Sequence, residues 1–549
     1  MLRPRSRPYL LRYERSLRPG LAPSVISLPT GDHPEGSPEL TQAVARIGPR
    51  RRFAVDVPAA LNLVGTLGKL LGLAALFPIP FALWYGETPL PFVVAGVATS
   101  GFGVALERLT VGSAGRVGVR EGFLVVALTW LLAAAFASIP YFFEGGEQLA
   151  SPVDAYFEGM SGFTTTGASV VTDYDEINRS LGIWRQFSQW LGGMGIIVLA
   201  IAVLPRLRVG GRQMMESELP GPEIAQLSER IRSTARKLWV FYVGLTALQT
   251  GMLATLGWVG IDNAMTPYQA LAHAFSTMPT GGFSTRPDSA AGFSAEAQWI
   301  LALFMLIAGA NFALMYRGFV LRRPRVLVRD EELRLYIALT LVALVALTAT
   351  LWGYGIAEGE EAVRTAFFQV VSIITTTGLV TTDFALWPAL LLLMLFALMF
   401  VGGSAGSTGG SIKVVRHLLL GKVLRREIDQ TLSPEFVMPI RLNGSPVDER
   451  TVRAVAAFIL LYVGFWAVGA SVIAIDSAIT GAGLGTLDSL ATSATAIGNI
   501  GPAFGVAGPY GSFAPLGDVS KITMIALMWV GRLEIIPVVV LLTRHYWRL

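Results

Sequence analysis

The chain has 549 residues, of which 53% are hydrophobic and 15% are charged, and its formal net charge is +5. Soluble domains carry about 25% charged residues, so this composition excludes a cytosolic enzyme, a nucleic-acid-binding protein and a secreted disulfide scaffold as first interpretations. Cysteine is absent and four histidines lie far apart, which excludes thiolate metal sites and disulfides. The composition predicts an all-α polytopic membrane protein.

Ten long apolar stretches predict membrane-spanning helices. Each has close to the ~20 residues that a span needs, except the eighth, which is too long. In chain order they cover 66–85, 90–107, 122–143, 186–204, 238–259, 297–316, 335–355, 386–424, 454–475 and 522–543. If these spans alternate, 36 of the 43 lysines and arginines lie on one side. The positive-inside rule then predicts that both termini are cytoplasmic, in a multi-pass protein of the cytoplasmic (inner) membrane.

The spans divide the chain into six parts. Residues 1–57 are rich in arginine without a helical period, which is typical of a disordered basic arm near anionic lipid headgroups. Two transmembrane helices occupy 58–110. The remaining parts are four repeats, at 119–208, 236–322, 334–426 and 451–549, and the third contains a broken second helix.

The four repeats share one plan, in which an apolar span, a short semi-polar helix, a turn rich in threonine and glycine, and a second span follow one another. The turns are TTTGAS at 164–169, MPTGGFST at 278–285, TTTGLVTT at 375–382 and GNIGPAFG at 498–505. The preceding helices are too short to span a bilayer. One such turn alone could be a kink or a loop, but four between spans predict re-entrant pore helices and filter strands in a pseudo-fourfold arrangement around one pore.

The residue types of the turns suit a monovalent cation that has lost its water. Rings of backbone carbonyls replace that water, and glycine adopts the backbone angles that aim them inward. The C-terminal ends of the pore helices carry partial negative charge, which favours cations. The predicted filter residues are Thr165, Thr166, Gly167, Thr280, Gly281, Thr376, Thr377, Gly378, Asn499, Ile500 and Gly501, with Gly167, Gly281, Gly378 and Gly501 as equivalent glycines.

The long stretch 386–424 is interrupted at 402–411 by five glycines, three serines, a threonine and an alanine. Each glycine costs a helix about 1 kcal/mol relative to alanine. The stretch is therefore either a kink with close helix packing or an unwound loop that lines a wet cavity. The residues of the predicted loop are Gly402, Gly403, Ser404, Ala405, Gly406, Ser407, Thr408, Gly409 and Gly410.

Outside the basic segment 413–453, Arg532 is the only arginine inside a predicted span. An ionisable residue within the membrane is a candidate for function. Glu534, two residues later, does not share its helix face. Arg532 therefore bonds to carbonyls of the loop, takes part in a structural clasp between an arginine and a glutamate of different helices, or does both.

The motifs REGFLV (120–125), QWLGGMGIIVLAIAVLPRL (189–207), GGSAGSTGGSIKVVR (402–416) and GRLEIIPVVVLL (531–542) accompany the turns. With them, residues 58–549 resemble the Trk/Ktr/HKT superfamily of potassium transporters, most closely the bacterial TrkH group. Two spans before the first repeat resemble TrkH more than the eight-span KtrB subunits. In this family a glycine in the first filter accompanies potassium selectivity and a serine accompanies sodium transport, so the resemblance implies potassium.

The resemblance implies potassium uptake through a gated, selective pore, with K⁺ bound at the filter residues only. It implies a homodimer, opened by a cytoplasmic RCK-type (TrkA-like) nucleotide-binding regulatory subunit that docks on the basic segments 205–237 and 413–453. It also implies that 402–410 is a gating loop and that Arg532 is an electrostatic barrier below the filter. The chain itself has no Walker A or GxGxxG motif, so nucleotide is expected only on the partner, and no other cofactor and no nucleic acid is expected.

Two other functions compete with this interpretation. A symporter that couples K⁺ to Na⁺ or H⁺ predicts ionisable residues at the membrane midplane, where only Arg532 and Glu534 are candidates. An intramembrane enzyme needs a nucleophile or metal motif such as HExxH, which the sequence lacks. We therefore expect no enzymatic activity.

Overall fold

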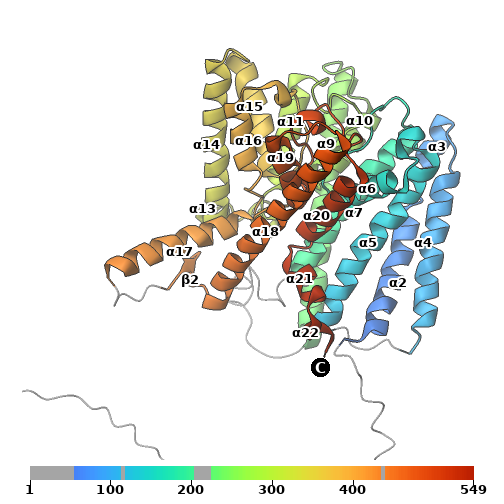
Figure 1. Ribbon diagram of the computed structural model, residues 1–549, viewed down its shortest axis with the longest axis horizontal. Helices are drawn as coiled ribbons and strands as arrows, with labels where there is room; N and C mark the ends of the chain where they lie inside the picture. Colours follow the sequence, from blue (N-terminus) through green and yellow to red (C-terminus); the bar gives the residue numbers. More distant parts are fainter. Residues whose placement is uncertain (1–54, 113–117, 203–223, 434–438, 549) are drawn as a thin grey trace, which may run out of the picture. The chain divides into compact units, whose positions relative to one another are not determined.

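The computed structural model describes residues 55–112, 118–202, 224–433 and 439–548, and these are mostly helical (Figure 1). The predicted basic arm lies outside the described residues except at its last three positions, and so does the part of the first basic segment up to residue 223. The description below concerns the described residues from 55 onward.

Three helices precede the first repeat and use glycines to pack closely. They are α2 (Val57–Ala74), α3 (Ile79–Tyr85) and α4 (Leu90–Leu109), and α2 and α4 lie beside α5 (Val119–Glu144) in Figure 1. A Cβ added at Gly65 would lie 2.6 Å from the carbonyl oxygen of Gly103, and one at Gly103 would lie 2.5 Å from that of Gly65. Small residues at such crossings allow membrane helices to approach closely.

The order of long helix, short helix, turn and further helix occurs four times among the described residues. The first set is α5, α6 (Pro152–Phe163) and α7 (Arg179–Ala202); the second is α9 (Ile224–Val259), α10 (Pro267–Thr277), α11 (Ala295–Ala308) and α12 (Phe312–Met315); the third is α14 (Glu331–Gly353), α15 (Gly359–Ile374), α16 (Ala389–Leu398) and α17 (Val414–Leu432); the fourth is α18 (Glu449–Thr480), α19 (Thr486–Gly498), α20 (Asp518–Arg532) and α21 (Ile536–Leu542).

Small elements connect these helices. They are the single turns η1 (Glu147–Leu149), η4 (Phe384–Leu386) and η5 (Gly505–Ala507), the π-helical turn η3 (Tyr316–Val320), α13 (Arg325–Arg329), α22 (Arg544–Trp547), and the antiparallel pair β1 (Arg441–Leu442) and β2 (Ser445–Pro446). Arg441 pairs with Pro446 in that short sheet.

Among the short helices α6, α10, α15 and α19, three begin with a hydrogen bond between a polar side chain and a backbone amide of the first turn. The Ser151 hydroxyl accepts from the amide of Val153, and the Thr266 hydroxyl accepts from the amide of Gln269. At the start of α19, the amide of Gly485 donates to the carboxylate of Asp488 at 2.9 Å. These helices have 11 to 16 residues. At 1.5 Å per residue they reach at most about 24 Å, so none crosses a hydrocarbon core of ~30 Å.

Within the described residues, six helices are long and apolar enough to cross a membrane, and eight spans result if each of two bent helix pairs counts as one. The predicted span 297–316 bends by 102° between α11 and the segment from Phe312 to Val320. The break follows Gly309, and the side chain of Asn311 starts the helix again by accepting from the amide of Leu314. The stretch 297–316 is predicted as one span, and the structure divides it into two helices.

The predicted span 522–543 is also not straight. It bends by 111° between α20 and α21, where Glu534 and Ile535 adopt the left-handed φ values of 58° and 60°. A β-branched residue is rare in that conformation. Because the two helices together are apolar enough to pass as one span, hydropathy alone does not reveal the break.

Candidate functional site

The four turns share one pattern of backbone conformation and hydrogen bonds. Each contains a non-glycine residue with left-handed φ, namely Thr165 (53°), Thr280 (55°), Thr376 (59°) and Asn499 (53°). In each turn this residue donates its amide to the carbonyl three residues earlier, and the next residue donates to the carbonyl five positions before itself. Non-glycine residues pay a conformational cost in this region, so its recurrence at one position in four turns indicates a shared structural requirement.

Two residues further along, each turn has a glycine with positive φ. These ring glycines are Gly167 (80°), Gly282 (83°), Gly378 (82°) and Gly501 (116°). An L-residue rarely adopts such angles, whereas glycine does so without steric cost. Glycine is required at these positions both by the positive φ and by the close approach of neighbouring backbone atoms.

The ring glycines approach one another in a closed cycle. A Cβ added at Gly167 would lie 2.2 Å from the carbonyl oxygen of Gly281, one at Gly282 would lie 2.0 Å from that of Thr377, and one at Gly378 would lie 2.0 Å from that of Ile500. The cycle closes at Gly501, where a Cβ would lie 3.0 Å from the carbonyl oxygen of Thr166. Each turn therefore contacts the next, and the fourth contacts the first.

The second turn differs from the predicted alignment by one residue. Gly281 is predicted as the equivalent of Gly167, but Gly282 has the matching φ and the matching contact. Gly281 corresponds to Thr166 and contributes the carbonyl that faces Gly167. The sequence MPTGGF offers two adjacent glycines, and only the left-handed conformation of Thr280 fixes which one completes the ring.

A cavity of about 320 Å³ opens on this ring, and all four ring glycines line it. Arg286 also lines the cavity, and its Nε donates to a carboxylate oxygen of Asp288 at 2.9 Å. That hydrogen bond raises the pKa of Arg286. The arginine charge at this cavity is therefore paired with a carboxylate.

The interrupted segment 402–411 is not helical and lies between α16 and α17. The hydroxyl of Thr408 donates to the carbonyls of Met278 at 3.1 Å and Ala308 at 3.2 Å. The amide of Gly410 donates to the Thr376 hydroxyl at 2.6 Å. The segment therefore packs against the C-terminal ends of short helices from two different repeats, directly at the turns.

Arg532 is 2% exposed and reaches the same segment. Its Nη1 donates to the carbonyl oxygen of Thr408 at 2.8 Å, and its Nη2 donates to that of Gly192 at 3.5 Å. Glu534 instead pairs with Arg416 at the start of α17, with 2.5 Å between Nη2 and Oε2. The structure therefore shows the predicted bond between Arg532 and a loop carbonyl. A clasp between an arginine and a glutamate also exists, but it joins Glu534 to Arg416 and not to Arg532.

A second cation lies beside Arg532. Lys413, which is 6% exposed, donates from Nζ to the carbonyl oxygen of Gly409. Lys413 belongs to the predicted basic segment 413–453, yet its ammonium bonds within the interrupted segment. Two buried cations thus hold adjacent carbonyls of residues 408 and 409.

Sequence reasoning misses a buried ion pair behind the first turn. Arg185 and Glu158 are 1% and 0% exposed and lie 2.6 Å apart from Nη2 to Oε1. The predictions from sequence assign neither residue a role. The available signal is the position of Glu158 in the second half of α6, where its neighbours from Ala155 to Phe163 are apolar or small.

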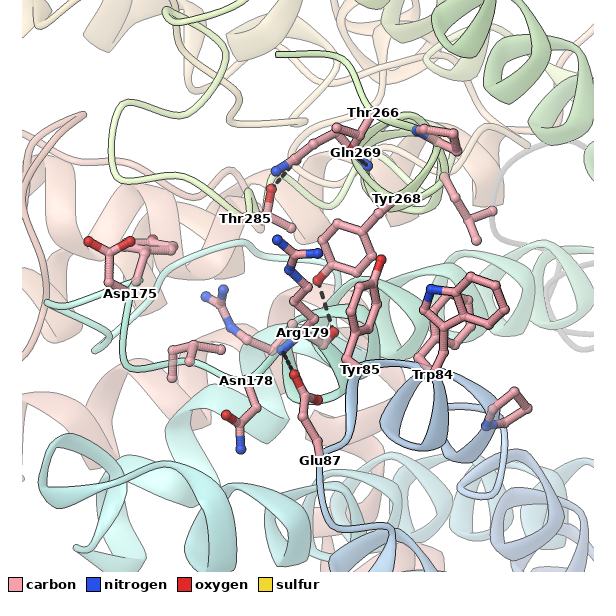
Figure 2. Close-up of a pocket in the computed structure, with 18 of the residues that line it drawn as sticks. Trp84, Tyr85, Glu87, Asp175, Asn178, Arg179, Thr266, Tyr268, Gln269 and Thr285 are labelled. Atoms are coloured by element: carbon pink, nitrogen blue, oxygen red, sulfur yellow. Dashed lines mark hydrogen bonds between the residues drawn. The ribbon is translucent and has the colours of Figure 1, made fainter. Parts of the chain in front are cut away.

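A larger cavity of about 1020 Å³ lies on the flank of the first two repeats (Figure 2). Figure 2 shows Tyr268 donating to the carbonyl of Arg179, and the backbone of Arg179 donating to Glu87. The guanidinium of Arg179 lies 4.6 Å from the ring centroid of Tyr85. No ring glycine lines this cavity, so it is separate from the opening at the four turns. In the described part of the chain, no group of three or more acidic or histidine side chains could hold a metal ion.

Comparisons with known proteins agree over most of the chain. A family model described as TrkH, cation transport protein, matches residues 92–547. The potassium uptake protein TrkH of Salmonella typhimurium is 37% identical over 85% of this chain and 97% of its own length, and TrkH of Halomonas elongata is 36% identical over 89% and 98%. The crystal structure of the potassium transporter TrkH from Vibrio parahaemolyticus matches with a TM-score of 0.79 at 33% identity, over 90% of this chain and all of that one. The chain therefore belongs to the TrkH family of potassium transporters, which are membrane proteins and not enzymes.

Proposed function

We propose that this chain takes up potassium through a selective pore that runs through the ring of four turns. The single observation that carries the proposal is the closed cycle of ring glycines, each facing a carbonyl oxygen of the neighbouring turn. In this proposal the four repeats surround one axis, and the predicted filter residues are joined by Gly282. Carbonyl rings of this kind replace the hydration shell of a monovalent cation.

The surroundings of the ring favour a cation. The short helices α6, α10, α15 and α19 all end at the turns, so their partially negative C-terminal ends point at the same place. The cavity that opens on the ring gives ions a way in, and its one lining arginine is neutralised by Asp288. K⁺ is the transported ion in this proposal, and the chain holds no resident cofactor.

The interrupted segment is the proposed gate. Residues 402–410 cover the turns on the side of the short-helix ends, and Arg532 and Lys413 place two positive charges there. Both the segment and the charges oppose the passage of a cation. Movement of α17, which follows the segment directly, would carry the gate with it.

The helix α17 is a suitable attachment for a regulator, because it extends away from the other helices (Figure 1). In this proposal both termini and the basic segments are cytoplasmic, the protein is a homodimer in the cytoplasmic membrane, and an RCK-type nucleotide-binding subunit docks on 413–453 and 205–237. Nucleotide would bind only to that partner. Arg425 on α17, which is 84% exposed, is one charge available for docking.

Ion flux in proteoliposomes tests this function. We expect the purified chain, with its regulator if the chain alone is closed, to pass K⁺ and Rb⁺ down their gradients faster than Na⁺ or Li⁺ without any coupling ion. Gly167→Ser should reduce the preference for K⁺, because an added Cβ would collide with the Gly281 carbonyl. The matched control is Gly251→Ala, at a glycine with no atom within 4 Å of an added Cβ.

Two results would count against this proposal. Flux that requires a Na⁺ or H⁺ gradient would show that the protein is a symporter and not a passive pore. An unchanged ion preference in a folded Gly167→Ser protein would remove the ring from the ion pathway.

A further inference from the structure

Three of the four short helices carry a large polar side chain at the same position. Glu158, His273 and Gln369 each lie seven residues before the left-handed residue of their own turn, and each is 0% exposed. Burying an apolar residue at such positions would cost less free energy, because a buried polar group must find a hydrogen-bond partner. These three buried side chains therefore each need a hydrogen-bond partner.

All three bind a hydroxyl in the segment just past the ring glycine of the same turn. Glu158 accepts from the Ser169 hydroxyl at 3.0 Å. His273 Nε2 lies 3.2 Å from the Ser284 hydroxyl, and Gln369 Nε2 donates to the Thr381 hydroxyl at 3.2 Å. The serines are two residues past the ring glycine and the threonine is three residues past it. We call these three bonds the tethers.

The first two tethers are linked by Arg185. Its guanidinium bonds Glu158 through Nε at 2.8 Å and the Ser169 hydroxyl through Nη2 at 3.0 Å. Its Nη1 donates to the carbonyl oxygen of Ser284 at 3.1 Å. One buried cation thus bonds the first and second segments at once, and hydrogen bonds that share partners in a buried network hold a geometry firmly.

The fourth turn lacks a tether. Its equivalent residue is Thr492, whose hydroxyl has no hydrogen-bond partner among the described residues. The residues that follow its ring glycine at the corresponding positions are Ala503 and Phe504, which have no hydroxyl. Here the amide of Ala503 donates to the carbonyl of Ala507 at 2.9 Å instead. The tethers are therefore a feature of three repeats and not an unavoidable consequence of the turn.

We propose that Glu158, His273 and Gln369 are positioning residues that set ion selectivity, because they fix the segments past the ring glycines and thereby the spacing of the ring carbonyls. The inference rests on the proposed function of the ring as an ion filter. None of the three side chains needs to touch the ion. Discrimination between K⁺ and Na⁺ depends on the number and placement of oxygens, so a loosened segment changes which ion is preferred before it stops flux.

The third tether offers the sharpest test, because it is separate from the ion pair. Thr381→Val removes the hydroxyl and keeps the shape, while Thr381→Ser keeps the hydroxyl and removes a methyl group. We expect the K⁺-to-Na⁺ flux ratio in proteoliposomes to fall by about threefold to tenfold in the valine variant, as loss of a partly buried hydrogen bond suggests. The serine variant should keep the ratio of the unmodified protein.

The control is Thr340→Val, which removes a buried hydroxyl that bonds only to the Tyr336 carbonyl of its own helix. It should leave the ratio unchanged. Gln369→Met removes the same tether from its other end and serves if Thr381→Val is not recovered as a folded protein. The double variant should show no further loss beyond either single one, since both changes delete one bond.

A ratio that stays unchanged in Thr381→Val and Gln369→Met, or that falls equally in Thr381→Ser, overturns the inference. Gly378→Ser in the same repeat separates this failure from failure of the filter. If Gly378→Ser changes the ratio while the tether variants do not, the filter stands and the tethers are merely structural. If none of these variants changes it, the proposed function fails as well.

Discussion

Arg532 and Thr408 lie 124 residues apart in the chain and are joined by a hydrogen bond of 2.8 Å from the guanidinium to the backbone carbonyl. The arginine ends α20, directly before the 111° bend, and the threonine belongs to the interrupted segment. The bond thus connects the fourth repeat to the third, at the place where a cation leaving the turns would pass in the proposed pore. A buried arginine whose charge no carboxylate neutralises directly is a strong barrier to such a cation.

Replacing Arg532 with alanine should raise K⁺ flux several-fold, because the change removes both the charge and the bond that holds the segment. Deleting residues 404–409 should act in the same direction. The measurement is Rb⁺ uptake into proteoliposomes at matched protein content. Arg334→Ala, at an exposed arginine of α14, is the control. Flux that is unchanged or lost in a folded Arg532→Ala protein would show that this arginine has a structural role.

The register of the second turn predicts a difference between two adjacent glycines. Gly282→Ala should abolish K⁺ flux, because Gly282 has a φ of 83° and an added Cβ would lie 2.0 Å from the Thr377 carbonyl oxygen. Gly281→Ala should cost less, since Gly281 is not among the glycines with positive φ and its added Cβ would meet the side chain of Gln189 rather than backbone. K⁺ flux measured on both variants decides which glycine belongs to the ring. A larger loss of flux in Gly281→Ala than in Gly282→Ala would identify Gly281 as the ring glycine.

Neutralising Glu158 should destabilise the protein strongly. Glu158→Gln leaves the guanidinium of Arg185 buried without its counter-charge, a change that costs about 3–5 kcal/mol in buried pairs. Thermal unfolding of the purified protein in detergent should show a lowered melting temperature. Glu449→Gln removes a carboxylate that is 59% exposed and pairs with Arg426, so it should change stability little. Equal shifts in the two variants would mean that the buried pair contributes no more than a surface pair.

Reversing the charge of Arg425 should weaken docking of the regulator and leave the flux of the chain alone unchanged. The side chain is 84% exposed and its carboxylate partner Asp429 is 3.9 Å away, so little of the fold depends on it. Binding of an RCK-type subunit to Arg425→Glu, measured at several salt concentrations, should be several-fold weaker at low salt, with the difference shrinking as salt rises. Equal binding at every salt concentration would place the docking surface elsewhere.

The sequence by itself determined the class of the protein and the position of its unusual segments. Apolar length and charge asymmetry predicted a helical membrane protein, and the Thr/Gly turns and the stretch 402–411 stood out because their residue types oppose a continuous helix. These properties are local, so they can be read from neighbouring residues along the chain. The family resemblance, which the comparisons confirm, rests on the same motifs.

Only the tertiary structure decided which residues meet. It placed Gly282 rather than Gly281 in the ring. It paired Glu534 with Arg416, and it bonded Arg532 to the carbonyl of Thr408. It also buried Glu158 against Arg185. It also bent two apolar stretches that hydropathy presents as straight. Each of these outcomes depends on packing between segments that lie far apart in the chain, and the pattern of neighbouring residues carries no information about such distances.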